Sequence, residues 1–284
     1  MADNTVRYAY ADTPLGQLHY AEVGAGHPIL LLHQTPRSLD EYREVQPMLA
    51  KHHRAIAMDM YGFGMSAKPQ AKQQTIEQYA TGVLALADAL GLERFAVMGH
   101  HTGMFVASEV AASAPGRVTA VVLSAGEYAD AEFRESASRE TGQRGTNEGG
   151  SDVDVDVAEI QEDGSHLTTL WAKRYPLYPK NRPDILNRLI RDCLAPGVDP
   201  AEGHYACARY VMEERVELVT APVLVLAATD DPVSYPHTAK VAGAYVNAKS
   251  VEVVEIVGGL IPLMEQKATE VAEVVEAFLR RVGV

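Results

Sequence analysis

Short apolar runs and amphipathic stretches alternate along most of this chain. Between Val6 and Tyr20 apolar and polar positions alternate around a turn at Pro14-Leu15-Gly16, which predicts a hairpin at a sheet edge. Continuous apolar runs then recur, and such runs suit strands that are covered on both faces. They lie at residues 28–32, 55–59, 95–98, 118–123, 222–226 and 251–257.

Segments with helical spacing separate these runs. The clearest extends from Ile76 to Leu90 and is followed by Gly91, where a helix would end. Further helices are expected at residues 38–51, 104–114, 238–245 and 269–281. Strands that alternate with helices build parallel βαβ units, so the pattern predicts an α/β fold.

The alternation stops after Glu127 and resumes after Val219. Residues 135–164 are rich in Gly, Ser, Asp and Glu, and helices are expected only near 167–175, 183–193 and 202–214. We therefore divide the chain into a core, 1–126 and 220–284, and a mostly helical insertion, 127–219.

Composition narrows the class of protein. The 284 residues are 47% apolar and carry a net charge of −13, which argues against nucleic acid or an anionic membrane as a partner. No apolar run reaches the roughly 18 residues of a membrane span, and the start lacks the features of a signal peptide. Two cysteines are too few for a disulfide framework. We expect a cytoplasmic protein.

The segment Gly99-His100-His101-Thr102-Gly103 lies between an expected strand and an expected helix. It has the form of a nucleophile elbow, in which small residues flank a strained central residue whose side chain stands above the sheet. The central residue here is His101.

Several segments together resemble the α/β-hydrolase superfamily, in its epoxide-hydrolase and esterase branch with a cap insertion. They are the elbow, the oxyanion-loop-like His33-Gln34-Thr35-Pro36, the turn from Asp59 to Ser66, Asp231-Pro232 in the place of the triad acid, and Gly258-Gly259-Leu260-Ile261-Pro262 in the place of the triad-histidine loop. The resemblance implies an α/β-hydrolase fold with a mostly parallel, doubly wound sheet. It also implies that the insertion is the cap.

Two positions depart from that family. His101 stands where Ser, Cys or Asp is expected, and Leu260 stands where the triad histidine is expected. The departures exclude a standard Ser-His-Asp triad at these positions. An imidazole on the elbow reaches farther than a serine hydroxyl, and a leucine at 260 leaves room for its ring. We therefore expect His101 to pair with Asp231 and to act as a general base.

The resemblance also implies the surroundings of this pair. Backbone N–H groups of Thr102 and of the Gln34–Thr35 turn are expected to form an oxyanion hole. The candidates for substrate binding are His100, Glu127, His166, Trp171, His204 and Leu260. Each of four candidates also has a purely structural alternative to substrate binding. His100 could be a packed structural histidine, and Trp171 could belong to the core. His166 and His204 could be solvated side chains without a role. Glu127 is also a reserve partner for His101.

No cofactor or metal is expected. Asp152-x-Asp154-x-Asp156 imitates the start of a calcium loop, but Val157 stands where the loop needs glycine and no closing glutamate follows. We interpret it as a solvated acidic stretch.

The sequence favours a cofactor-independent hydrolase of a small, largely apolar ester or lactone. Two alternatives remain: an enzyme of proton transfer, such as a lyase, decarboxylase or isomerase, and a catalytically silent ligand-binding protein. The expected partner is a small organic molecule, and a homodimer is an open expectation.

Overall fold

A single eight-stranded sheet forms the centre of the molecule. The structure is a computed structural model that describes residues 5–70, 73–142 and 155–284. The strand order is β1-β2-β4-β3-β5-β6-β7-β8. The pairs β1–β2 and β2–β4 are antiparallel and all other pairs are parallel. The strands are β1 Arg7–Thr13, β2 Gly16–Val23, β3 His27–Leu32, β4 His53–Met58, β5 Phe95–His100, β6 Val118–Ser124, β7 Val223–Ala228 and β8 Val251–Ile256.

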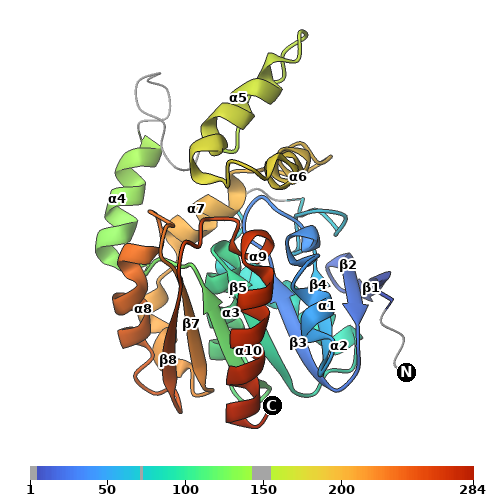
Figure 1. The fold of residues 1–284 in the computed structure, drawn as a ribbon, viewed down its shortest axis with the longest axis vertical. Helices are drawn as coiled ribbons and strands as arrows, with labels where there is room; N and C mark the ends of the chain where they lie inside the picture. The colour runs from blue at the N-terminus through green and yellow to red at the C-terminus, as the bar shows by residue number, and fades with distance from the viewer. Residues whose placement is uncertain (1–4, 71–72, 143–154) are drawn as a thin grey trace.

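Helices cover both faces of this sheet (Figure 1). Side chains of a strand point alternately to its two faces, and β3 shows the result. Leu30 and Leu32 belong to a core shared with α2, α3 and α8, whereas Ile29 and Leu31 belong to a core shared with α1 and α10. The core helices are α1 Gln46–Leu49, α2 Ile76–Ala89, α3 Thr102–Ser113, α8 Thr238–Ala244, α9 Leu263–Gln266 and α10 Ala268–Val282.

The cap lies above the carboxyl ends of the parallel strands, between β6 and β7 (Figure 1). The domain boundaries placed at 127 and 219 fall inside this interval. The cap elements are α4 Ala131–Gly142, α5 Ser165–Arg174, η3 Tyr175–Leu177, α6 Pro183–Cys193, α7 Glu202–Arg209, η4 Met212–Glu214 and η5 Val216–Leu218. None of the helices in the described ranges combines the length and the apolar character that a membrane crossing requires.

Two expected helices differ from the structure, and one helix was not expected. The helix expected at 38–51 is two short pieces, η1 Leu39–Tyr42 and α1, because Pro47 has no N–H to continue the helical ladder. The helix expected at 202–214 ends at Arg209 and continues as the separate turn η4. We expected no helix at α4, whose sequence lacks apolar periodicity; it forms where it packs against α7.

Candidate active site

The elbow between β5 and α3 is a strained turn. His101 has φ 46° and ψ −116°, a conformation that non-glycine residues rarely adopt. A Cβ added at Gly99 would lie 1.9 Å from the carbonyl oxygen of Gly103, and one added at Gly103 would lie 2.1 Å from that of Leu32. Both flanking positions therefore require glycine, and the central side chain is directed to the cavity above the sheet.

His101 contacts Asp231, which follows β7. Nε2 of His101 lies 3.0 Å from Oδ2 of Asp231. Nε2 is nevertheless without a well-directed hydrogen bond, so the two groups are close but poorly aligned. The other nitrogen, Nδ1, has no hydrogen-bond partner in the described part of the chain and is not enclosed. Nδ1 is therefore the nitrogen that can meet a ligand.

Asp231 is fully buried and held as a carboxylate. Its oxygens accept hydrogen bonds from the Ser234 hydroxyl, at 2.6 Å, and from the Val233 N–H, at 3.0 Å. Burial raises the pKa of Asp231, but the nearby His101 and these hydrogen bonds outweigh burial, so the pKa lies well below its ordinary value. A permanent negative charge thus stands beside the His101 ring.

The three residues expected to form the oxyanion hole all line the cavity, but they differ in whether the backbone N–H is already bonded. The N–H of Gln34 donates to Oε2 of Glu41 at 2.7 Å, so this donor is not available to a ligand. Thr35 and Thr102 both line the cavity, and no hydrogen bond from either backbone N–H occurs among the described residues. Of the three residues expected to form the hole, Thr35 and Thr102 have donors that could meet an oxyanion.

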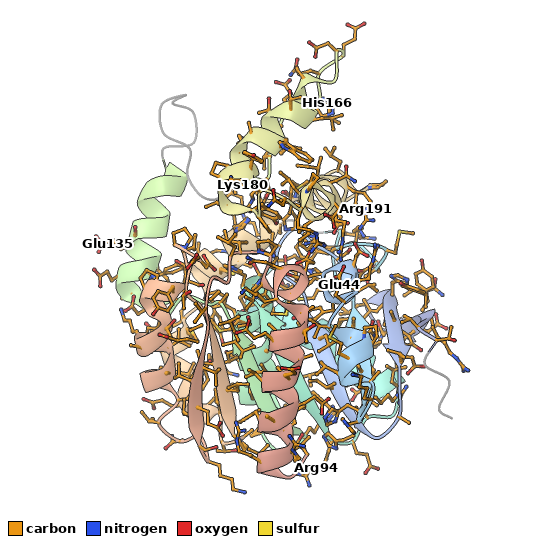
Figure 2. All side chains as sticks on the ribbon, in the orientation of Figure 1. Glu44, Arg94, Glu135, His166, Lys180 and Arg191 are labelled. Atoms are coloured by element: carbon orange, nitrogen blue, oxygen red, sulfur yellow. The ribbon has the colours of Figure 1, made fainter. Side chains whose placement is uncertain are left out.

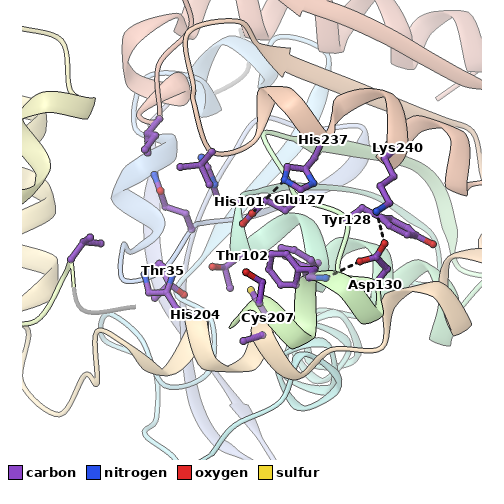
Figure 3. A pocket seen from close by; sticks show the side chains of 18 of the residues that line it. Thr35, His101, Thr102, Glu127, Tyr128, Asp130, His204, Cys207, His237 and Lys240 are labelled. Carbon is purple, nitrogen blue, oxygen red and sulfur yellow. Dashed lines mark hydrogen bonds and ion pairs between the residues drawn. The ribbon is translucent and has the colours of Figure 1, made fainter. Parts of the chain in front are cut away.

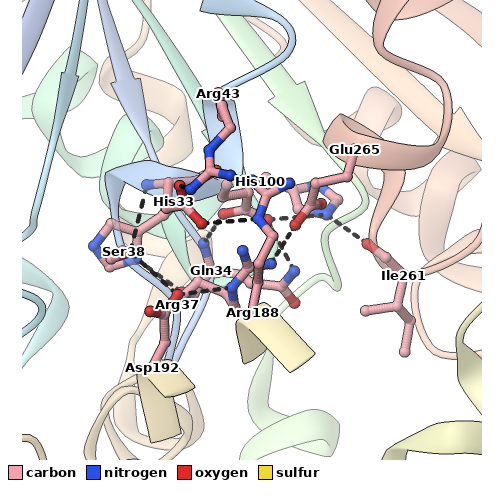
Figure 4. A network of polar contacts seen from close by, with 12 residues as sticks. His33, Gln34, Arg37, Ser38, Arg43, His100, Arg188, Asp192, Ile261 and Glu265 are labelled. Atoms are coloured by element: carbon pink, nitrogen blue, oxygen red, sulfur yellow. Dashed lines mark hydrogen bonds and ion pairs between the residues drawn. The ribbon is translucent and has the colours of Figure 1, made fainter. Parts of the chain in front are cut away.

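A buried charged network surrounds the Gln34 turn (Figure 4). Glu41 also accepts from the Gln34 amide at 2.8 Å, and Arg37 bridges Glu265 and Asp192. Burial raises the pKa of Glu41 to about 8 and Glu265 adds to the rise, while Arg37 and the Gln34 donors oppose it. We did not foresee this network, because closely spaced charges such as Asp40-Glu41 and Arg43-Glu44 usually mark a solvated helix face.

His100 is a buried support of the elbow. It is 0% exposed, its ring packs edge-on against that of His101 at 4.7 Å, and it does not line the cavity. Nε2 donates to the Ile261 carbonyl at 2.8 Å and Nδ1 pairs with the Ser124 hydroxyl at 3.0 Å. Burial lowers the pKa of His100 to about 3, and His101 contributes to the fall. His100 is therefore neutral at pH 7 and has no face open to substrate.

A cavity of about 450 Å³ lies between the elbow and the cap (Figure 3). Besides the residues already described, charged and imidazole groups from the cap and from α8 line it together with aromatic and aliphatic side chains. The lining includes Gln34, Thr35, His101, Thr102, Phe105, Glu127, Tyr128, Asp130, Glu132, Phe133, Arg174, Leu177, His204, Cys207, Val233, His237, Lys240 and Ile261. The cavity thus combines charged and apolar groups, whereas the substrate expected from the sequence was largely apolar.

Two of the other five expected substrate-binding residues line the cavity. Glu127 and His204 line the cavity, whereas His166, Trp171 and Leu260 do not. His166 lies near the outer end of α5, away from the core (Figure 2). Trp171 packs against the small apolar core of the cap. The N–H of Leu260 donates to the Gln266 side chain, and the neighbouring Ile261 lines the cavity instead.

Two polar contacts lie at the β6 and α8 side of the cavity. Nε2 of His237 is 3.8 Å from Oε1 of Glu127, and Lys240 forms an ion pair with Asp130 (Figure 3). Glu127, the reserve partner for His101, thus lies near His237, whereas Asp231 is the acid 3.0 Å from His101. The described residues hold no group of three or more His, Cys, Asp or Glu arranged to hold a metal ion.

The acidic stretch in the cap is not solvated at Asp156. This carboxylate is 1% exposed and contacts both Arg174 and His204. Our interpretation of the stretch was therefore wrong for Asp156. Arg174, 18 residues away in the sequence, balances its charge, and sequence spacing alone does not reveal this pairing. Asp152 and Asp154 lie outside the described residues.

Comparisons with known proteins agree with this architecture. A family model described as the α/β hydrolase fold matches residues 27–260. Haloalkane dehalogenase 2 from Mycobacterium tuberculosis is 36% identical over 112 residues, which cover 39% of this chain and 39% of that protein. The soluble epoxide hydrolase of a Corynebacterium species is 40% identical over 93 residues, 32% of each chain. The aligned segments thus span about two fifths or less of these relatives.

A solved structure resembles nearly the whole chain. The enol-lactonase from Burkholderia xenovorans superposes with a TM-score of 0.76 at 20% identity, over 96% of this chain and all of that one. At such low identity the superposition shows the shared fold alone. The family model covers most of the chain. The chain therefore belongs to the α/β-hydrolase fold family.

Proposed function

We propose that this protein hydrolyses a small ester or lactone, with the attacking water activated by His101. The observation that carries the proposal is the 3.0 Å distance between Nε2 of His101, on the elbow, and the buried carboxylate of Asp231. The hydrolase names of the matched relatives support the reaction class.

The two nitrogens of His101 have different tasks in this mechanism. Nε2 faces Asp231, so Nδ1 takes a proton from water as the hydroxide adds to the carbonyl carbon. The negative charge moves to the carbonyl oxygen, which can accept from the N–H groups of Thr35 and Thr102. Collapse of the intermediate breaks the bond to the leaving oxygen, which takes the proton back from His101. Asp231 stays ionised and stabilises the imidazolium.

This route needs no acyl-enzyme. Water attacks directly, and the elbow supplies a base in place of a serine nucleophile. Direct attack by the imidazole would form an acyl-imidazole, a second intermediate that itself has to be hydrolysed. The two routes differ in whether a burst of leaving group precedes steady turnover.

The test compares the wild type with His101→Gln on 4-nitrophenyl acetate and on a small lactone. Loss of a general base lowers turnover by about 10²- to 10⁴-fold, so His101→Gln is expected to retain about 1% of kcat/KM or less. No burst is expected, and a serine-directed fluorophosphonate is expected not to label the protein. Turnover that survives the substitution undiminished would remove His101 from the mechanism. Solvent deuterium found on a substrate carbon without ester cleavage would assign proton-transfer chemistry instead.

A further inference from the structure

A buried ionic cluster in the cap faces the same cavity as His101. Both oxygens of Asp156 contact the Arg174 guanidinium, with Nε at 2.7 Å from Oδ1. His204 contacts the same carboxylate, with Nε2 at 2.9 Å from Oδ2. Burial raises the pKa of Asp156, but Arg174 and His204 outweigh burial and hold the pKa at about 2. Asp156 is therefore a carboxylate that fixes two cationic or imidazole side chains side by side.

The cluster has two unused nitrogens. Nη1 of Arg174 and Nδ1 of His204 have no hydrogen-bond partner within the described ranges, and neither atom is enclosed. Arg174 and His204 line the cavity, while Asp156 is not part of the lining. The carboxylate thus sits behind the two side chains, and their free nitrogens are the groups that a cavity ligand meets.

The cluster lies close to Thr35, whose N–H group we assign to the oxyanion hole. His204 follows Gly203, where an added Cβ would lie 1.7 Å from Oγ1 of Thr35. The start of α7 therefore rests directly on the loop whose Thr35 N–H faces the cavity. Figure 3 shows His204 beside Thr35, on the side of the cavity opposite His237 and Lys240.

We propose that Arg174 and His204 bind a carboxylate of the substrate, so that the substrate is an ester or lactone that also carries an acid group. This inference rests on the proposed function and names its substrate class. The free Arg174 nitrogen donates to one carboxylate oxygen of the bound ligand. His204 contacts the other oxygen, and because Nε2 already faces Asp156, donation from Nδ1 requires the imidazolium form in the complex.

The other cation in the cavity is poorly placed for this role. Lys240 is paired with Asp130 and stands among Glu127 and Glu132, so acidic groups surround it. Arg174 differs because it is 7% exposed, is oriented by two contacts to Asp156, and still presents a donor to the cavity. A buried guanidinium of this kind is preorganised, and little conformational entropy is lost when it binds a ligand.

The experiment uses two substrates that differ only in charge: 4-nitrophenyl hydrogen adipate and its methyl ester. The variant is Arg174→Gln, and the control is Lys173→Gln, which removes one positive charge from the exposed face of the same helix. We expect the wild type to prefer the free acid. Arg174→Gln should lower kcat/KM for the acid by about 10- to 100-fold and change that for the methyl ester by less than threefold. Lys173→Gln should change neither.

Equal losses on both substrates, or no preference in the wild type, would overturn the inference. Because Arg174→Gln leaves Asp156 without its partner and could unfold the cap, His204→Gln provides a second variant that keeps the Asp156–Arg174 pair. It should also reduce the preference for the acid, and an unchanged preference would count against the carboxylate site.

A binding measurement separates this inference from the proposed function. Isothermal titration with monomethyl adipate is carried out in the His101→Gln background, because this ester belongs to the proposed substrate class. We expect binding to His101→Gln that weakens at least tenfold when Arg174→Gln is added. Dimethyl adipate and the amide of monomethyl adipate should bind weakly to both, and equal binding of the amide and the acid would overturn the inference. Absence of His101-dependent hydrolysis together with Arg174-dependent binding would reject the proposed function and keep the carboxylate site.

Discussion

Gln34 directs N–H donors from both its backbone and its side chain to the two carboxyl oxygens of Glu41, at 2.7 and 2.8 Å. The contact fixes the peptide that precedes Thr35. It thereby orients the N–H group that we assign to the oxyanion hole, although Glu41 itself lies outside the cavity. Glu41 is a positioning residue in this arrangement.

Glu41→Gln is expected to lower kcat by about tenfold or more with a smaller change in KM. Both oxygens of the Glu41 carboxyl group can accept from Gln34, whereas the amide that replaces it has one oxygen and one NH2 group, so one Gln34 donor faces an N–H group and the loop shifts. Steady-state kinetics on 4-nitrophenyl acetate measure the change. Glu44→Gln is the control, because it removes an acid from the same segment and Glu44 pairs with Arg188 and not with Gln34. Equal effects of the two substitutions would contradict the positioning role.

Gly103→Ala is expected to destabilise the fold more than an ordinary surface substitution does. The new methyl group would lie 2.1 Å from the Leu32 carbonyl oxygen, and backbone on both sides leaves it little room to move. Overpacking of this kind costs typically 1–3 kcal/mol and occasionally more. Urea unfolding measures the loss. Gly116→Ala is the control, since a Cβ there meets nothing within 4 Å, and a similar midpoint for both variants would contradict the close-packed elbow.

Acid should destabilise the wild type partly through Asp231. The pKa of this carboxyl is lower in the folded protein than in the unfolded chain, so its stabilisation is present above the unfolded value of about 4 and is lost as the pH falls toward the folded value. Asp231→Asn removes this pH-dependent contribution to the free energy of unfolding. Its unfolding midpoint in urea should therefore fall less than that of the wild type between pH 5 and pH 3. Parallel pH curves for the two proteins would show that the pKa of Asp231 is not depressed.

The sequence could place His101 near Asp231 because both follow parallel strands. The carboxyl ends of β5 and β7 meet at one edge of the sheet, with only β6 between them, so residues after these strands are close whatever their distance in sequence. The same argument anticipates the cavity-facing positions of Thr35 and Thr102. It is a rule of topology, and it needs only the strand order.

The buried charges follow no such rule. Asp156 and Arg174 meet across 18 residues of the cap, and Arg37 meets Asp192 across 155 residues. Hydrophobic periodicity shows which face of a helix or strand is buried, but it does not show which charged side chains are buried next to one another. The hydrogen bond from the Gln34 N–H to Glu41 could not be predicted for the same reason. The sequence around Glu41 is typical of an exposed helix face.

The glycines around the elbow fix a backbone shape but leave the identity of the central side chain open. A serine would fit at position 101 without disturbing Gly99 or Gly103, yet it would find leucine at 260, where the related loops carry its base. A return to serine chemistry therefore needs two coordinated changes. His101→Ser alone should be inert toward fluorophosphonate, while His101→Ser with Leu260→His should react. His101→Ser alone gives up the present base, and Leu260→His alone supplies a histidine without a serine for it to activate, so neither single change provides a serine nucleophile with its base.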